Sequence, residues 1–285
     1  MTTFEDHRGK LFAIAYRMVG SAMDAEDIVQ DAWLRYQNIQ TPLDNPMAFL
    51  RKIVTNLSLD HLKSAKVKRE QYIGEWLPEP IATDTASPAD ALNKAETISV
   101  AFLVVLETLS PPERAVFILR EVFDYDYKDI ADILDKSESA CRQIFSRAKK
   151  HIHDNRPRFD ATPEAHTRLV NHFITALQEG DITKITNALA QDATLVSDGG
   201  GKVAAATRPL HGRDKILRFL LGLHKRAMDM GVNYENIPIM LNGEQGLISR
   251  MIPSGEIIFA ATFEVHQEQI ITLRLMRNPD KLGTL

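Results

Sequence analysis

The chain has 285 residues, of which 44% are hydrophobic and 25% charged, and its formal net charge is -4. This composition predicts two or three folded domains and excludes a wholly disordered chain. The negative net charge argues against a protein that coats nucleic acid without sequence preference, because such proteins are basic overall. We expect a cytoplasmic protein without a signal peptide or membrane span, since no apolar run is long enough and the first ten residues lack a signal's layout.

Charge is unevenly distributed along the first 158 residues. Acidic residues gather at Asp24, Glu26, Asp27 and Asp31. A basic stretch follows with Arg51, Lys52, Lys63, Lys66, Lys68 and Arg69, and a second one contains Arg142, Arg147, Lys149, Lys150, Arg156 and Arg158. Two basic patches separated by an acidic surface suggest two DNA contacts and one protein contact, although solvated helix faces would explain either patch alone.

The single cysteine, Cys141, can form neither an internal disulfide nor a cysteine-rich zinc site. We predict that it is a small buried apolar residue. No motif indicates a metal or a cofactor, so we expect neither.

The segment up to residue 158 has a helical pattern throughout. Apolar residues recur every three or four positions in stripes that begin at Leu11, Ile28 and Phe49, which predicts a small helical bundle. Residues 75–85, EWLPEPIATDT, are acidic, contain two prolines and lack periodicity, so they predict an irregular linker. A helix should then begin near Ser87, Pro88 and Asp90 and continue to about Leu109. The capping-box sequence from Ser110 to Glu113 marks the next helix start.

The most specific local motif is YKDIADILDKSESACRQIFSRAKK, residues 127–150. It predicts a helix-turn-helix, in which the small Ala131 permits close approach of the second helix and Ser137 caps that helix. Residue types that suit groove reading occupy the accessible side: Glu138, Ser139, Arg142, Gln143, Ser146 and Arg147. Arginine can bond bidentately to guanine and glutamine to adenine, while Lys149 and Lys150 suit phosphates.

After residue 158 the pattern predicts an α+β domain. Helices are expected from Thr162 to Gly180, from Ile182 to Leu189 and from Asp214 to Met228. Alternating or β-branched segments separated by turn residues predict strands at 193–197, 202–206, 246–252, 256–265 and 269–276. Together they indicate a mainly antiparallel, curved sheet packed on helices.

Several of these segments resemble the extracytoplasmic-function (ECF) RNA polymerase sigma factors. LSPPERAVFILREVFDYDYKDIADIL, followed by SRAKK, resembles region 4 of that family. DAEDIVQDAWLRY resembles regions 2.1 and 2.2, and NPMAFLRKIVTNLSLDHLKSAKVKRE resembles regions 2.3 and 2.4, so the resemblance extends from Phe4 to His151. The motifs WLPEP, DGGGK and NPDKL further resemble the subgroup with a fused SnoaL-like, nuclear-transport-factor-2-like domain at its C-terminus.

The resemblance implies a multidomain fold of two all-α modules followed by a cone-shaped α+β domain. It divides the chain into region 2 at 1–72, a linker at 73–90, region 4 at 91–158 and the SnoaL-like domain at 159–285. It further implies a non-enzymatic protein that directs core RNA polymerase to promoter DNA. The C-terminal domain would regulate this activity through contact with the sigma modules.

The resemblance also assigns roles to individual residues. Contacts with core polymerase are expected at Asp24, Glu26, Asp27, Gln30 and Asp31. Contacts with the -10 element are expected at Asn56, Asp60, His61, Lys63 and Lys66. Contacts with the -35 element are expected at Ser139, Arg142, Gln143, Ser146, Arg147, Lys149 and Lys150. Regulatory contacts are expected at Trp76, Leu77, Pro78, Asp198, Gly199, Gly200, Gly201, Lys202, Asn278, Pro279, Asp280, Lys281 and Leu282.

Two residues depart from the family pattern. Asp135 stands where a glycine is usual in the helix-turn-helix turn, and aspartate tolerates positive φ better than most residues. Cys141 stands where valine is usual. Phe49 can either stack on a DNA base or belong to the core.

Two alternatives to a polymerase-bound factor remain at this point. One is an ordinary helix-turn-helix repressor or activator that binds duplex DNA alone. The other is a SnoaL-like isomerase or cyclase fused to a DNA-binding module, for which the candidate general bases are Asp192, Asp198, His211 and His266. A small molecule could bind the last domain, but no motif indicates one.

Overall fold

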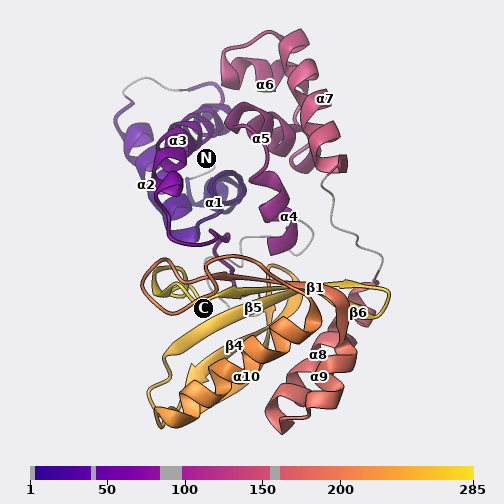
Figure 1. Ribbon diagram of the computed structural model, residues 1–285. Coiled ribbons are helices and arrows are strands. Elements are labelled where there is room, and N and C mark those ends of the chain that lie inside the picture. The colour runs from indigo at the N-terminus through magenta and orange to yellow at the C-terminus, as the bar shows by residue number, and fades with distance from the viewer. Residues whose placement is uncertain (1–3, 40–42, 84–97, 155–160) are drawn as a thin grey trace. The chain divides into compact units, whose positions relative to one another are not determined.

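The computed structural model describes residues 4–39, 43–83, 98–154 and 161–285, without the side chains of residues 66–70. The chain forms two compact units (Figure 1). The first, here called the helical unit, includes Met1–Gln71 and Phe102–Arg156. The second, the sheet unit, includes Tyr72–Thr85, Ser99–Ala101 and Pro157–Leu285. Tyr72–Thr85, most of the first part of the predicted linker, therefore belongs to the same unit as the C-terminal domain.

Three helices build the first part of the helical unit: α1 (Glu5–Val19), α2 (Ala22–Gln37) and α3 (Pro46–Glu70). Helix α1 ends at Gly20, and the Ser21 hydroxyl accepts a hydrogen bond from the N–H of Asp24 to cap α2. The predicted stripes lie in the core, where Leu11, Ile14, Ala15 and Met18 of α1 are fully buried. Phe49 is half-buried, so both of its interpretations stay open.

The second part contains α4 (Val100–Leu106) from Phe102 onward, α5 (Pro111–Phe117), the π-helical turn η3 (Ile118–Val122), α6 (Tyr127–Leu134) and α7 (Glu138–Asp154). The capping box from Ser110 to Glu113 is confirmed. The expected helix start at Ser87, Pro88 and Asp90 lies outside the described residues.

Helices α6 and α7 form the predicted helix-turn-helix. Asp135 ends α6 with a φ of 51°, as its place in the turn predicts, and the Ser137 hydroxyl accepts a hydrogen bond from the N–H of Ala140 at the start of α7. Ile130, Ala131 and the predicted Cys141 are buried between the helices. The helix pair thus has its own apolar core.

Two buried arginines, neither of them predicted from the sequence, join the parts of the helical unit. Arg17 and Arg114 are 1% and 2% exposed. The Nε of Arg114 donates to the carbonyl oxygen of Arg17 at 3.0 Å, and its guanidinium pairs with Glu107. Arg17 also lies over the ring of Phe123, 5.0 Å from its centroid. These contacts attach α1 to the helices of the second part.

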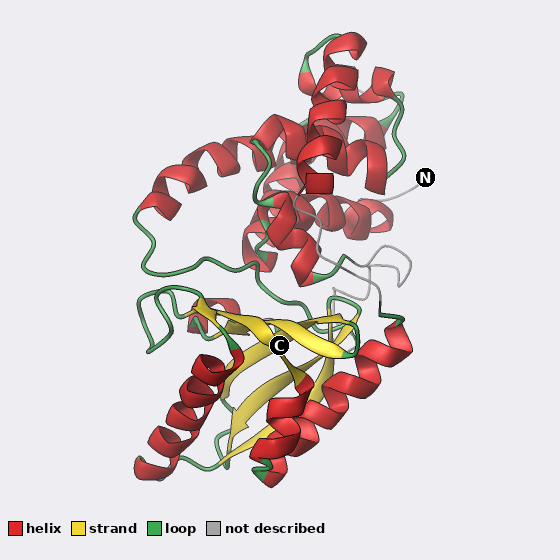
Figure 2. Ribbon diagram, turned by 45° about the vertical axis from the view of Figure 1, so that its right-hand side comes forward, coloured by secondary structure: helices red, strands yellow, loops and turns green. Residues whose placement is uncertain are grey.

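The sheet unit packs helices against one bent sheet (Figure 2). Its helices are α8 (Pro163–Glu179), α9 (Ile182–Ala188) and α10 (Arg213–Asp229), close to the predicted bounds. Its strands are β1 (Leu189–Asp198), β2 (Leu210–His211), β3 (Tyr234–Leu241), β4 (Glu244–Met251), β5 (Ile257–His266) and β6 (Gln269–Met276). They are ordered β2-β1-β6-β5-β4-β3, and every pair is antiparallel except β1 with β6. The short helix η4 (Pro279–Lys281) follows β6.

The strand prediction for this unit was wrong at one segment and missed strands β2 and β3. Residues 202–206 form a turn and loop, because the N–H groups of Lys202 and Val203 bond back to the oxygen of Gly199. His211, one of the candidate general bases, belongs to β2 and lies opposite Thr194. Strand β3 was not predicted, because Pro238 disfavours a strand; β3 lies at the sheet edge, where a proline is tolerated.

Candidate nucleic-acid interface and linker clamp

Helix α7 presents one apolar and one polar face. Cys141, Ile144 and Ala148 are buried on the inner face. All seven residues expected to contact the -35 element are exposed: Ser139, Arg142, Gln143, Ser146, Arg147, Lys149 and Lys150. The helical period therefore brings the candidate DNA-reading residues together on one accessible surface.

Carboxylates of the same module hold several of these cations. Arg142 pairs with Glu138 at 2.7 Å and lies over the ring of Tyr127, 5.0 Å from its centroid. Lys149 pairs with Glu121 at 3.1 Å. These are exposed pairs of low strength, so a phosphate or a base can replace the carboxylate at small cost.

Glu113 connects the capping box to the recognition helix. Burial raises the pKa of this carboxyl, but its hydrogen bonds with Ser110 and the nearby His151 and Arg147 outweigh burial and hold the pKa below its ordinary value. The ring of His151 and the guanidinium of Arg147 each lie 3.9 Å from it. Glu113 therefore stays charged beside the cationic face of α7.

Helix α3 carries the residues expected at the -10 element. Asn56 and His61 are half-buried, whereas Asp60 and Lys63 are exposed and form an ion pair at 2.9 Å. The side chain of Lys66 lies outside the described residues. Lys52, which was not singled out for DNA contact, donates to the backbone carbonyl oxygen of Asp132 at 2.7 Å and to the carboxylate of Asp135 at 2.9 Å. Helix α3 therefore contacts the turn of the helix-turn-helix.

The residues expected to contact core polymerase lie on α2. Asp27, Gln30 and Asp31 are exposed, whereas Glu26 is half-buried and pairs with Arg8 at 2.7 Å. Asp24 lies 3.6 Å from the ring of His61 on α3. The exposed hydrophobic residue Leu34 lies further along the same helix. An acidic face with an apolar residue at its end is thus available to a partner.

The motifs WLPEP, DGGGK and NPDKL meet around the fully buried carboxylate of Asp198; we call this arrangement the linker clamp. One carboxylate oxygen accepts from the Tyr72 hydroxyl at 2.6 Å and from the N–H of Gly200 at 3.0 Å. The other accepts from the N–H of Leu77 at 2.9 Å and from Nζ of Lys281 at 2.8 Å. Four donors thereby satisfy a charge that would otherwise be costly to bury.

Lys281 and Asn278 complete the clamp from the C-terminal side. The ammonium of Lys281 also donates to the oxygen of Leu77 at 2.7 Å and lies over the ring of Trp76, 4.1 Å from its centroid. The Asn278 amide donates to the Tyr72 hydroxyl at 3.0 Å. Burial, followed by the hydrogen bond to Asp198, raises the pKa of Tyr72 above its ordinary value. Tyr72 therefore remains a neutral donor to the carboxylate.

The glycines of DGGGK permit close packing on this clamp. Gly200 and Gly201 have φ values of 61° and 71°. A Cβ on Gly200 would lie 2.5 Å from the side chain of Asn278, and one on Gly201 would lie 2.9 Å from Ile73. At the edge of the motif, Lys202 pairs with Asp280 at 2.6 Å. The structure thus brings together the residues expected to be regulatory.

The rest of the linker continues along the sheet unit. Ala82 forms an antiparallel bridge with Leu241 of β3, and Ile81 exchanges two hydrogen bonds with Asn242. The Thr284 hydroxyl donates to Glu79 at 3.1 Å. Leu77, Pro78 and Ile81 are buried by these contacts. The linker residues that the structure describes are therefore an integral part of the sheet unit.

The four candidate general bases lie outside the lining of the cavity in the sheet unit. The sheet unit contains a cavity of about 370 Å³, but Asp192, Asp198, His211 and His266 do not line it. In the described ranges, no three acidic, histidine or cysteine side chains are grouped so as to hold a metal. No helix among the described segments is long and apolar enough to cross a membrane. A general base in an apolar pocket, which the enzymatic alternative requires, is not found among these four residues.

The contacts of Tyr72, Lys52 and the two buried arginines were not predicted from the sequence. Tyr72 lies just before the linker, and its partner Asp198 is 126 positions away. Nothing in the local pattern connects two such residues. Lys52 was counted in a basic patch, which was the only available signal.

The chain is similar in sequence and in structure to known sigma factors. The Sigma-70 region 2 family model matches residues 3–67, and the Sigma-70, region 4 model matches residues 99–152. The chain is 36% identical to the ECF RNA polymerase sigma factor SigJ of Mycobacterium tuberculosis, over 99% of this chain and 92% of the relative. It is 35% identical to the probable ECF RNA polymerase sigma factor SigI of the same organism, over 64% of each. The crystal structure of M. tuberculosis SigJ superposes with a TM-score of 0.79 at 34% identity and covers 99% of this chain and 97% of that one.

Proposed function

Because this chain belongs to the ECF RNA polymerase sigma factors, which direct core polymerase to promoters, we propose that the exposed face of α7 reads its -35 element. The observation that carries this proposal is the exposure of all seven candidate residues on a helix whose other face is buried. The chain is a transcription initiation factor and not an enzyme. The family assignment also replaces the alternative of a repressor or activator that acts without polymerase.

Base reading is assigned to the first half of α7. In a helix-turn-helix, the N-terminal part of the second helix contacts base edges, which favours Ser139, Arg142 and Gln143. Lys149 and Lys150 follow at the C-terminal end and suit phosphate contacts.

The -10 element and the polymerase are assigned to the other two helices. The exposed acids of α2, Asp27 and Asp31, suit a basic surface on core polymerase. The exposed Lys63 of α3, with the half-buried Asn56 and His61, suits the -10 strand. We place this activity in the cytoplasm, where the polymerase works.

Promoter discrimination tests the assignment of α7. Holoenzyme with Arg142→Ala should lose about 1–3 kcal/mol of binding free energy and discriminate less at one base pair of the -35 element. Lys150→Ala should weaken binding equally on all sequences and lower the slope of log affinity against log salt by about 1. Arg168→Ala, an exposed arginine of α8, is the matched control. Unchanged base preference for Arg142→Ala, measured by binding to a set of single-base-pair promoter variants, would contradict the assignment.

Core-enzyme binding tests the assignment of α2. Asp27→Lys with Asp31→Lys should reduce capture of the chain by core polymerase at least tenfold at low salt, because two attractive charges become repulsive. Asp229→Lys with Glu256→Lys, two exposed acids of the sheet unit, controls for the change in net charge. Equal capture of both double variants would show that α2 does not provide the contact.

We further propose that the linker clamp regulates this activity in cis. The clamp fixes the linker residues between the first helices and the helix-turn-helix to the sheet unit. Binding of two promoter elements at once depends on the tether between the binding modules, so releasing the linker changes their effective concentration. The buried Asp198–Lys281 ion pair supports this role. Burying the Asp198 carboxylate destabilises the sheet unit unless linker groups such as the Leu77 N–H also donate hydrogen bonds to it.

Run-off transcription with purified components tests regulation. Asp198→Asn, and separately deletion of residues 278–285, should change transcript yield severalfold while core binding is kept. Lys225→Gln, an exposed charge of α10 away from the clamp, should have no effect. Wild-type yield from a folded Asp198→Asn protein would end the proposal, with circular dichroism and core binding as the checks on folding.

A further inference from the structure

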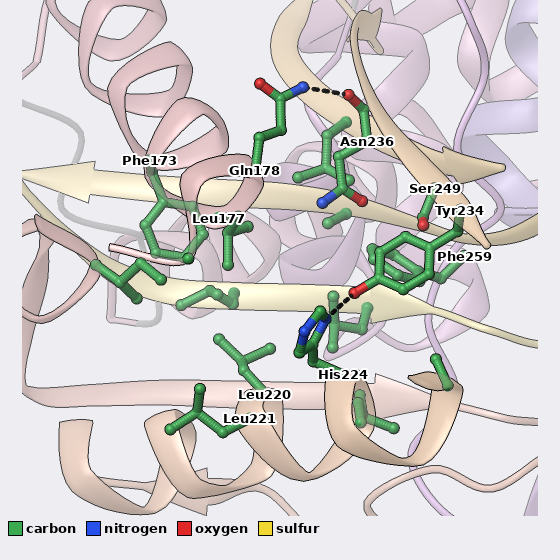
Figure 3. Close-up of a pocket in the computed structure, with 18 of the residues that line it drawn as sticks. Phe173, Leu177, Gln178, Leu220, Leu221, His224, Tyr234, Asn236, Ser249 and Phe259 are labelled. Carbon is green, nitrogen blue, oxygen red and sulfur yellow. Dashed lines mark hydrogen bonds between the residues drawn. The ribbon is translucent and has the colours of Figure 1, made fainter. Parts of the chain in front are cut away.

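The cavity of about 370 Å³ lies inside the sheet unit, between its helices and the concave face of the sheet (Figure 3). Phe173 and Leu177 of α8 line one side, and Leu220 and Leu221 of α10 line the opposite side. Its volume is in the range of small-molecule sites, about 300–1,000 Å³. Its walls are mainly apolar, so they suit an apolar ligand.

Helix α10 indicates that this space is not an ordinary core. Ile216 is the only residue of α10 that is buried, and it is fully buried. Leu217, Leu220 and Leu223 line the cavity or its edge and are only half-buried, and Leu221 is 42% exposed. An amphipathic helix normally buries such a stripe against its domain. An apolar molecule in the cavity would remove these leucines from water.

On the sheet side of the cavity, three polar side chains lie in one row across the strands, in addition to polar groups on α8, α10 and Tyr234. Asn236 of β3 pairs with Ser249 of β4, and Ser249 pairs with Phe259 of β5. Ala260 pairs with Met276, which places Arg277, one residue later, at the Phe259 end of the row. All four residues line the cavity. The aromatic ring of Phe259 is thus flanked by hydrogen-bonding side chains.

Three polar atoms of this row have no protein partner among the described residues. They are Oδ1 of Asn236, Oγ of Ser249 and Nε of Arg277. Ser249 is 0% exposed, and Figure 3 shows it beside Tyr234 and Phe259 on the cavity wall. A buried polar group without a partner costs about 1–3 kcal/mol, which a ligand that supplies the partner recovers.

Arg277 determines the charge of the expected ligand. Its guanidinium donates to the oxygen of Ala204, and in the described part of the chain no carboxylate lies within ion-pair distance of it. The other charged groups on the cavity wall are engaged: Glu179 pairs with Lys184 at 2.9 Å, and His224 bonds to the Tyr234 hydroxyl at 2.7 Å. Burial, and then repulsion from Arg226, lower the pKa of Arg277, as expected for a cation without a counter-ion. The missing counterpart is an anion.

We propose that this cavity binds an apolar carboxylic acid, with its hydrocarbon part between α8 and α10 and its carboxylate between Arg277 and Ser249. Neighbouring strands lie about 4.8 Å apart, so the backbones at Ser249 and Arg277 are separated by about 10 Å. An arginine side chain and a carboxylate together bridge that gap. Arg277 Nε and the Ser249 hydroxyl donate to the two carboxylate oxygens, and Asn236 accepts from any further hydroxyl of the ligand.

The carboxylate end of the cavity adjoins the linker clamp. The backbone N–H of Arg277 donates to the carbonyl oxygen of Asp198 at 2.7 Å, and the next residue is Asn278. A ligand that holds Arg277 would therefore stabilise the clamp. This consequence rests on the proposed regulatory function, whereas binding itself does not.

Calorimetric titration of the full chain with decanoate, a simple apolar carboxylate, tests the site. Decanoate should bind saturably with one molecule per chain, and neutral methyl decanoate should bind at least tenfold more weakly. Arg277→Gln should weaken decanoate roughly 10- to 100-fold, as expected for loss of a charge-assisted hydrogen bond, and leave methyl decanoate unchanged. Arg218→Gln, an exposed arginine of α10 outside the cavity, should bind both like wild type.

Filling the cavity distinguishes internal binding from adsorption. Ala261→Phe should abolish binding of both probes, and Leu221→Trp at the half-exposed edge serves the same purpose if the first variant does not fold. Absence of saturable decanoate binding by the wild-type chain, or undiminished binding by the filled variants, overturns the site. Wild-type transcription from Asp198→Asn would instead overturn only the regulatory proposal, because the titration does not depend on it.

Discussion

Cys141 shows how much one residue's chemistry can be read from sequence. It is the only cysteine, it lies on the inner face of a predicted helix, and it is fully buried in the helix-turn-helix core. Asp135 was likewise predicted to adopt positive φ from its place in the turn. Tyr72 was not predictable, because its role depends on Asp198, 126 positions away.

Alkylation of Cys141 measures the stability of that core. Burial raises the pKa of its thiol, so little reactive thiolate is available to reagents in the folded chain. Iodoacetamide should therefore modify the native protein at least about a hundredfold more slowly than the urea-unfolded protein, followed by mass spectrometry. Equal rates would mean that α6 and α7 separate readily in solution.

Glu244 at the start of β4 introduces a pH dependence. Burial and the neighbouring Glu264 raise the pKa of its carboxyl from 4.5 to about 7. The folded state therefore holds a proton that the unfolded state releases, and stability falls as pH rises from about 4.5 to about 7.

Replacing this carboxyl by an amide removes that loss. Glu244→Gln should match wild type near pH 4 and exceed it at pH 8 by up to about 3 kcal/mol in urea unfolding, since one pKa unit corresponds to about 1.4 kcal/mol. The exposed Glu256→Gln is the control. A gain that is the same at both pH values would assign the effect to packing instead.

At the scale of elements, helices were predicted better than strands. A helix can be predicted from the local spacing of apolar residues and from its caps, as the capping box at Ser110 and the helix from Thr162 to Gly180 show. Strand β3 was hidden by Pro238, since whether a strand is at a sheet edge is a property of the tertiary fold. Residues 202–206 looked like a strand, but three preceding glycines turn the chain back there.

The cap of α7 makes a quantitative prediction for the recognition helix. Ser137→Ala removes the acceptor for the N–H of Ala140 and should destabilise the helical unit by about 1 kcal/mol. Ser146→Ala, an exposed position inside the same helix, should be neutral or slightly stabilising, because alanine has the higher helix propensity. Thermal melts of both variants followed by circular dichroism at 222 nm check this. Equal melting temperatures for the two would contradict a capping role.

At the scale of the whole molecule, the motif WLPEP was recognised as belonging with DGGGK and NPDKL, but only through family resemblance. Spacing alone cannot show that Leu77 contacts Asp198 and Lys281, which are 121 and 204 positions away. The linker was predicted as a separate segment, whereas the part of it that the structure describes packs in the sheet unit.

The two tryptophans allow each unit to be followed separately, since Trp33 lies in the helical unit and Trp76 in the sheet unit. Asp198→Asn leaves Lys281 buried beside a neutral side chain and should cost about 3–5 kcal/mol in the sheet unit. In a Trp33→Phe background, the urea midpoint of Trp76 fluorescence should fall. In a Trp76→Phe background, the midpoint of Trp33 should stay the same. A common shift in both backgrounds would mean that the units unfold as one cooperative system.

Because the chain passes between the two units more than once, truncation at a single position cannot separate the helical unit from the sheet unit. The polypeptide enters the sheet unit at Tyr72, leaves it for the helix-turn-helix and returns at Pro157. A protein truncated before Pro157 would keep Leu77 and Ile81, which are 3% and 2% exposed in the intact fold. It would lack the strands that cover them. Such a fragment exposes an apolar, aggregation-prone segment and also loses a domain. Any change in its activity therefore reflects both effects together.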